Sequence, residues 1–152
     1  GRIPMQMLDC IPTPTRMSKC AWCCVVVLVV VQTVAMVAEV FFWTCWFEYV
    51  CVARDVGGFQ GDTISATQFL GKNMGLYNGF LAAGLFWSLR EPKGLDARLA
   101  FFFASCVLVA GVVGALTVPV PDGKIMLLIG QGLFAACALV ALFYPAICPL
   151  SD

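Results

Sequence analysis

Glu39 is the residue whose type and position most directly suggest chemistry, because it lies inside an apolar run that begins at Ala21. A carboxylate within hydrocarbon costs roughly 2.5–3.5 kcal/mol on insertion scales, so it normally faces a helix bundle or a cavity. Gln32 stands seven residues earlier, on the same face of a helix. The two residues could form a proton relay, an ion site or an axial ligand to a pigment metal. Alternatively, a protonated Glu39 joins helices by hydrogen bonds, with these candidate partners: Asn73, Tyr77, Asn78 and Gln131.

A second polar group lies in the apolar segment 68–89 and consists of Asn73, Tyr77 and Asn78. Asn73 and Tyr77 are about one helical turn apart. Such side chains hydrogen-bond between transmembrane helices for about 0.6 kcal/mol on average. They could instead line a small binding pocket, so that ligand binding stays open beside helix packing.

Small residues recur at regular positions in the apolar segments. In 68–89 they occupy every fourth position: Gly71, Gly75, Gly79 and Ala83. In water, each glycine would weaken a helix by about 1 kcal/mol relative to alanine, but between transmembrane helices small residues allow the backbones to approach closely. Gly111, Gly114 and Gly132 offer further flat surfaces. We expect all seven residues to serve helix packing.

The chain has nine cysteines and no histidine, so cysteine is the residue to consider for metal binding and redox chemistry. Cys20 and Cys23 form a CxxC motif at the edge of the first apolar run, which could be a redox pair. A zinc site would need four thiolates, drawn from Cys10, Cys20, Cys23 and Cys24. We predict no metal site. We also predict no enzyme, because the sequence has no phosphate loop, nucleophile elbow or paired catalytic carboxylates.

The composition assigns the chain to the integral membrane proteins. Of its 152 residues, 61% are hydrophobic and 12% are charged, whereas soluble domains have about 45–50% apolar and about 25% charged residues. Nine basic and nine acidic residues cancel, so we expect no nucleic-acid partner.

The pattern of apolar runs and breakers predicts an all-α, four-span transmembrane helix bundle. We expect a polar tail over residues 1–20, a transmembrane domain over 21–146 and a short C-terminal tail over 147–152. The expected spans are 21–46, 68–89, 98–117 and 124–144. A tight turn is expected at Pro119, Pro121, Asp122 and Gly123.

Four spans place both termini on one side of the membrane. That side would carry six basic residues (Arg2, Arg16, Lys19, Arg90, Lys93 and Arg98) and the other side three, which indicates the cytoplasmic, stromal or matrix side. The sequence starts at Gly1 rather than methionine. It is therefore a fragment or a mature product, and the latter would indicate an organellar or secretory route.

Several stretches resemble a family of small four-helix membrane proteins that is catalogued as a domain of unknown function, number 1304. Residues 73–85 resemble its NQGLYNGFLAAGL signature, and 39–43 are similar to its E-M-F-x-W segment. Residues 109–117 are similar to its VAGxxGALT segment, and Gln131-Gly132 fits its Q-G. The resemblance covers roughly 25–144 and implies a fold and a topology, but no reaction.

Two positions depart from the family pattern. The family commonly has histidine where Gln32 stands and glutamine where Met74 stands. If histidine and Glu39 form a working pair in the family, this chain lacks half of it, which weakens an enzymatic or transport role.

These observations favour a non-catalytic accessory subunit of a photosynthetic or respiratory complex, in a thylakoid or inner mitochondrial membrane. Its partners would be membrane lipids and other subunits. It needs no cofactor, but it could hold chlorophyll, carotenoid or lipid, with Gln32, Glu39 or Asn78 as magnesium ligands. The alternatives are a small proton or solute transporter that uses Glu39, and a thiol-redox membrane protein that uses Cys20 and Cys23.

Overall fold

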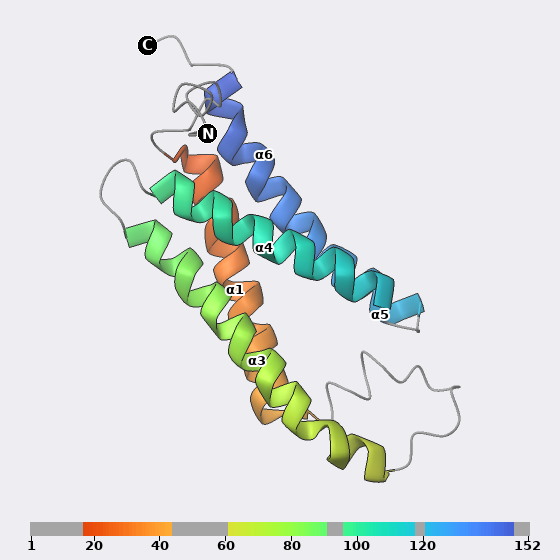
Figure 1. The fold of residues 1–152 in the computed structure, drawn as a ribbon. Coiled ribbons are helices and arrows are strands. Elements are labelled where there is room, and N and C mark those ends of the chain that lie inside the picture. The colour runs from red at the N-terminus through yellow and green to blue at the C-terminus, as the bar shows by residue number, and fades with distance from the viewer. Residues whose placement is uncertain (1–16, 44–60, 91–95, 118–120, 148–152) are drawn as a thin grey trace, which may run out of the picture.

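The computed structural model describes residues 17–43, 61–90, 96–117 and 121–147, with side chains for 17–43, 67–90, 97–117 and 124–144. The described residues form helices and no strand (Figure 1). The first three helices are α1 (Lys19–Phe41), α3 (Gly61–Arg90) and α4 (Asp96–Thr117). A last, continuous helical segment consists of α5 (Pro121–Leu127), the π-helical segment η2 (Leu128–Leu133) and α6 (Phe134–Ile147). The all-α class predicted from the sequence is confirmed.

Three helical segments are long and apolar enough to cross a membrane: Lys19–Phe41, Ala97–Thr117 and Lys124–Tyr144. They confirm the membrane class and overlap three of the four expected spans. The remaining expected span, 68–89, lies within the thirty-residue helix α3. This helix is not among the three, because its lysine and two asparagines lower its hydropathy.

Several helix ends differ from the sequence-based expectation. Helix α1 begins two residues early, because the Ser18 side chain caps it by accepting a hydrogen bond from the backbone N–H of Ala21 at 3.1 Å. Helix α3 begins at 61 rather than 68. The expected turn at Pro121–Gly123 is the start of α5, since proline fits the first helical position. Helix α6 continues to Ile147, beyond the expected end of its span. Residues 1–16 and 148–152 of the expected tails, and 44–46 of the first span, lie outside the described residues.

The helices form two antiparallel hairpins, one of α1 and α3 and the other of α4 with α5, η2 and α6. The hairpins touch through α3 with α4 and through α1 with α6. Figure 1 shows them close together at the end that holds the start of α1 and the end of α6, and apart at the other end. Accordingly, the described part of α3 makes no contact with α5, η2 or α6.

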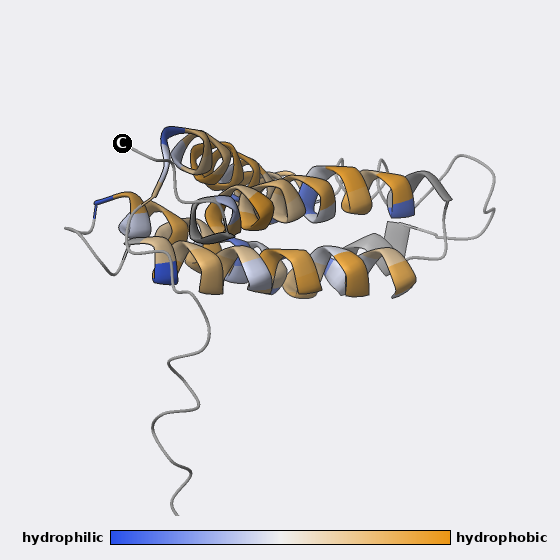
Figure 2. Ribbon diagram, turned by 90° about the horizontal axis from the view of Figure 1, so that it is seen from above, coloured by the Kyte–Doolittle hydropathy of each residue, from blue (hydrophilic) through white to orange (hydrophobic). Residues whose placement is uncertain are grey.

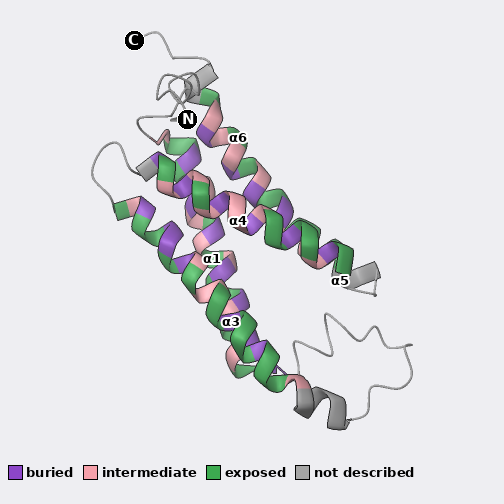
Figure 3. Cartoon of the chain, in the orientation of Figure 1, coloured by how far each residue is buried: buried purple, intermediate pink, exposed green. Residues whose placement is uncertain are grey.

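Buried residues follow a three-and-four spacing on α1 and α4, which is the periodicity of helices that pack at a shallow left-handed angle (Figure 3). On α1 they are Ala21, Val25, Leu28, Gln32, Ala35 and Glu39. On α4 they are Ala97, Ala100, Ala104, Val107, Gly111 and Ala115. The α4 seam is thus made almost entirely of alanine and glycine, which lets neighbouring helices come close.

The helices consist largely of hydrophobic residues (Figure 2), and many of these residues are exposed on the outer surface. Large hydrophobic side chains such as Phe41, Phe102, Leu116 and Val140 are more than half exposed. A soluble protein rarely exposes so much contiguous apolar surface. The surface therefore fits contact with lipid tails or with other membrane helices.

Candidate functional site

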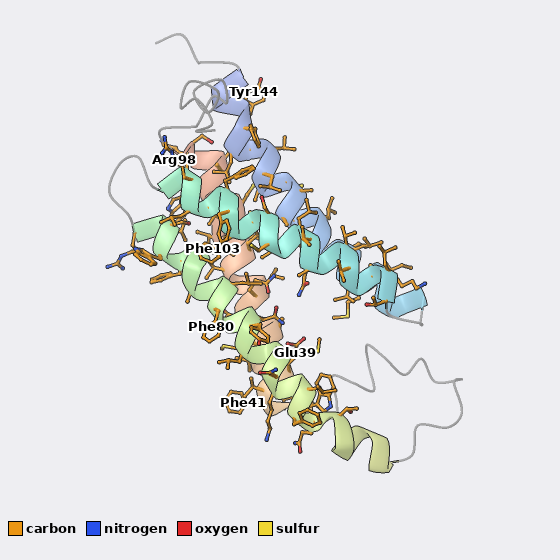
Figure 4. All side chains as sticks on the ribbon, in the orientation of Figure 1. Glu39, Phe41, Phe80, Arg98, Phe103 and Tyr144 are labelled. Atoms are coloured by element: carbon orange, nitrogen blue, oxygen red, sulfur yellow. The ribbon has the colours of Figure 1, made fainter. Side chains whose placement is uncertain are left out.

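Glu39 and Asn78 form a polar pair between α1 and α3. The Asn78 side-chain amide donates a hydrogen bond to Oε2 of Glu39 at 2.7 Å. Glu39 is only 5% exposed. Its carboxyl group therefore faces α3, as Figure 4 shows on the inner side of the first hairpin. The arrangement has the features of a hydrogen-bonded joint between helices.

Three glycines of α3 bring this helix close enough to α1 for the pair to form. A Cβ atom built at Gly71 would lie 2.1 Å from the Trp43 ring, and one at Gly79 would lie 2.7 Å from Sδ of Met36. At Gly75 it would lie 3.0 Å from the backbone oxygen of Met36. Any side chain at these positions would push the helices apart and lengthen the Glu39–Asn78 hydrogen bond.

Ala83 is the last of the four small residues that recur at every fourth position of α3. It is exposed, and Ala82 is buried instead. The reason is helical geometry. Three steps of four residues rotate a side chain by about 120° around an α-helix. A strict four-residue spacing therefore leaves the interface by the position of Ala83.

Gln32 is completely enclosed in the helix bundle, with 0% of its surface exposed. Neither its Nε2 nor its Oε1 has a hydrogen-bond partner among the described residues. A pigment macrocycle has no access to this side chain, so the structure does not fit Gln32 as an axial ligand. A buried amide without partners is destabilising by about 1–3 kcal/mol.

Asn73 and Tyr77 do not join Asn78. Both are exposed, Tyr77 by 59%, and the Tyr77 ring makes an edge contact with Phe80 at a centroid distance of 6.3 Å. Asn73 and Asn78 are five residues apart, which is about 140° around a helix. The polar residues of α3 are thus divided between an inner side, with Asn78, and an outer side, with Asn73 and Tyr77.

Gln131 lies in η2, on the wall of an apolar groove between this segment and α1. The groove has a volume of about 230 Å³. Its walls are formed by Val30, Val31, Val34, Ala35, Met126, Leu127, Gly130 and Gln131. Glu39 does not line it. An apolar chain, such as that of a lipid or a carotenoid, has the chemistry that this groove would accept.

The glycines of the second hairpin differ in what lies next to them. A Cβ atom at Gly111 would lie 2.8 Å from the backbone nitrogen of Gly132, and one at Gly114 would lie 3.1 Å from Cδ1 of Leu127. Gly132 is buried, whereas a Cβ atom at Gly130 would meet nothing within 4 Å. Packing between α4 and η2 thus depends on Gly111 far more than on Gly130.

The described cysteines include three that line one groove, and these three extend beyond the CxxC motif. Cys20, Cys24 and Cys137 line a second groove, between α1 and α6, whereas Cys23 does not. Cys137 is far away in sequence, and no motif links it to the others. Within the described residues, no cluster of cysteine or acidic side chains is placed to hold a metal ion. Cys10 lies outside the described residues.

Comparison with known proteins gives one match. A family model described as a protein of unknown function (DUF1304) matches residues 25–143. No curated protein and no solved structure matches the chain.

Proposed function

We propose that this chain, which belongs to the DUF1304 family of proteins of unknown function, is a non-catalytic subunit of a larger membrane assembly. We further propose an organellar membrane, thylakoid or inner mitochondrial. In this proposal the chain crosses the membrane four times, with both termini on the stromal, matrix or cytoplasmic side.

The proposal rests on two polar side chains on the outer side of α3. Asn73 and Tyr77 are exposed there and make no hydrogen bond within the described residues. The hydroxyl side chains of several residues on α1 and α4, by contrast, are satisfied locally. Thr33, Ser105 and Thr117 each donate a hydrogen bond to a backbone oxygen four residues earlier, at 2.7–2.9 Å.

A carboxamide cannot be left unpaired in hydrocarbon without cost, because lipid tails offer no hydrogen-bond partner. A helix of another subunit could supply the partner, and the neighbouring ring of Phe80 adds apolar contact area. Asn73 and Tyr77 therefore favour a protein neighbour over lipid at this surface.

The interior of the first hairpin supports α3 as the second span. Asn78 is paired with Glu39, so its amide adds little to the cost of insertion. With α3 crossing, the start of α1 and the end of α6 lie on one side, in keeping with their common end in Figure 1. The excess of basic residues on that side, six against three, favours the proposed orientation.

The test is the native mass of the full chain, expressed in its own host and extracted in a mild detergent. We expect the wild type to migrate in a particle much larger than its 16.4 kDa chain. The variant Asn73→Leu/Tyr77→Phe should migrate as a small particle, because the outer side of α3 has lost its polar groups.

Thr33→Val is the matched control, since it removes a locally satisfied hydroxyl from the exposed side of α1. It should leave the large particle unchanged. The absorption spectrum of the same fraction reports any bound pigment. A wild-type protein that migrates as a small, colourless particle would overturn the subunit proposal and return attention to Glu39 and transport.

A further inference from the structure

A groove with a volume of about 470 Å³ lies between the first turns of α1 and the part of α6 from Ala136 to Tyr144. Its walls are Ser18, Cys20, Cys24, Ala136, Cys137, Val140, Ala141 and Tyr144. Apart from the Ser18 and Tyr144 hydroxyls, the lining consists of apolar groups and thiols. The α6 wall runs from Ala136 to Tyr144, a rise of about 12 Å. Val140 and Tyr144 are more than 60% exposed, so the groove is open along its outer side.

Three of the five described cysteines line this one groove, although they come from opposite ends of the chain. Cys20 is exposed and stands in the first turn of α1, next to Lys19. A reagent at the membrane surface can therefore reach the Cys20 thiol, while the groove continues from this thiol toward the apolar middle of α6.

We propose that Cys20 is a site of S-acylation, and that the attached long-chain acyl group lies in the groove between α1 and α6. The donor is a long-chain acyl thioester of coenzyme A. The Cys20 thiolate attacks the thioester carbonyl, a new carbon–sulfur bond forms, and the bond to the coenzyme A sulfur breaks. The coenzyme A thiolate takes up the proton that Cys20 released. No electron is transferred, so neither an oxidant nor a reductant is needed.

The position of Cys20 and the apolar lining fit this modification better than a free thiol. Cysteines next to a membrane are the usual sites of reversible acylation. Within the bilayer an acyl chain exchanges lipid contacts for the groove lining, so van der Waals packing and the covalent attachment at Cys20 would hold it there. An acyl chain along Val140 and Ala141 would fill the groove and link the first helix of the chain to the last.

The experiment measures the intact mass of the full chain isolated from its native membrane, before and after treatment with hydroxylamine, which cleaves thioesters. We expect the wild type to carry the mass of one long-chain acyl group and to lose it on treatment. Cys20→Ser should abolish the added mass. Cys23→Ser, which changes a cysteine that is also exposed but does not line the groove, should retain it.

Thiol labelling then tests where the chain lies. In the acylated wild type, Cys137 should react with a maleimide several-fold more slowly than after hydroxylamine treatment. Cys106, which lies in α4 away from the groove, should react at an unchanged rate. Circular dichroism of each variant checks that the helices are intact.

Three results would overturn the proposal. The first is a wild-type chain whose mass does not change on hydroxylamine treatment, and the second is an added mass that is lost in Cys23→Ser but kept in Cys20→Ser. The third is a rate of Cys137 labelling that is the same before and after hydroxylamine treatment. A mass two hydrogens lower that a reductant restores would indicate a disulfide in place of the thioester. None of these results bears on the native mass of the Asn73 and Tyr77 variants, so the subunit proposal stands or falls separately.

Discussion

The two hairpins of this protein achieve close helix packing by different means. In the first, glycines of α3 face the side chains of Met36 in α1 and of Trp43 just after its end, and the Glu39–Asn78 hydrogen bond joins the two helices. In the second, Gly111 of α4 lies against the backbone of Gly132. In the first interface the nearest atoms belong mostly to side chains, and only Gly75 also approaches a backbone atom, the oxygen of Met36. At Gly111 in the second interface the nearest atom is a backbone nitrogen, which cannot move out of the way as a side chain can. Substitutions should therefore affect the two hairpins to different degrees.

The largest effect is expected for Gly111→Leu. A Cβ atom alone would lie 2.8 Å from a backbone nitrogen, and a leucine side chain would force α4 and η2 apart. We expect a loss of about 3 kcal/mol of unfolding free energy, at the upper end of overpacking effects. The measurement is reversible unfolding of the purified chain in mixed micelles, followed by circular dichroism.

Gly130→Leu is the matched control for this substitution, because nothing lies within 4 Å of a Cβ atom at that position. Its unfolding free energy should stay close to that of the wild type. Equal losses for both variants would show that α4 and η2 do not pack through Gly111.

A smaller loss is expected for Asn78→Leu in the first hairpin. It removes the amide that donates to Glu39 and leaves the buried carboxyl group without that donor, at a cost of about 2 kcal/mol. Glu39→Gln should cost less, because a carboxamide oxygen still accepts a hydrogen bond from Asn78. Unfolding of both single variants and the double variant gives the coupling energy. Strictly additive effects would exclude the pair as the joint between α1 and α3.

Gln32→Leu should raise the unfolding free energy by about 1 kcal/mol. The substitution replaces a fully buried, unpaired amide with an apolar side chain of similar size. The same micelle titration measures the gain. A loss of stability instead would mean that the amide binds a buried water molecule.

The smallest effect is expected at Ala83, the last of the four regularly spaced small residues of α3. Ala83→Val should change the unfolding free energy by less than about 0.5 kcal/mol, because Ala83 is exposed. Ala82→Val, one residue away, adds volume to a buried position and should cost about 1 kcal/mol. If the two variants behave alike, the contact face of α3 has been assigned incorrectly.

The sequence was sufficient to predict the features that depend on composition and local periodicity. Long apolar runs predicted the helical membrane class, and the spacing of Gly71, Gly75 and Gly79 indicated the face of α3 that packs against a neighbour. The intramembrane position of Glu39 indicated a polar partner, and Asn78 was among the candidates.

The remaining features depend on which helices become neighbours and at what angle. Asn73 and Asn78 are close in sequence, but the helical rotation places them on different sides of α3. Cys137 reaches the same groove as Cys20 only because α6 packs beside α1. The enclosure of Gln32 likewise depends on how its neighbouring helices meet, and no pattern in its own helix reveals it.

The π-helical segment η2 has a consequence for how the length of the last helix can change. A π-helical turn contains one residue more than an α-helical turn. The segment therefore contains one residue more than an α-helix of the same length would. Deleting Gly130, which has no neighbours at its Cβ position, would convert η2 to α-helix while α5 and α6 each keep their facing toward α4. A one-residue deletion in the middle of α4 would instead rotate half of that helix by about 100°. Within the described helices, η2 is therefore a segment in which one residue can be gained or lost with little change in the facing of its neighbours.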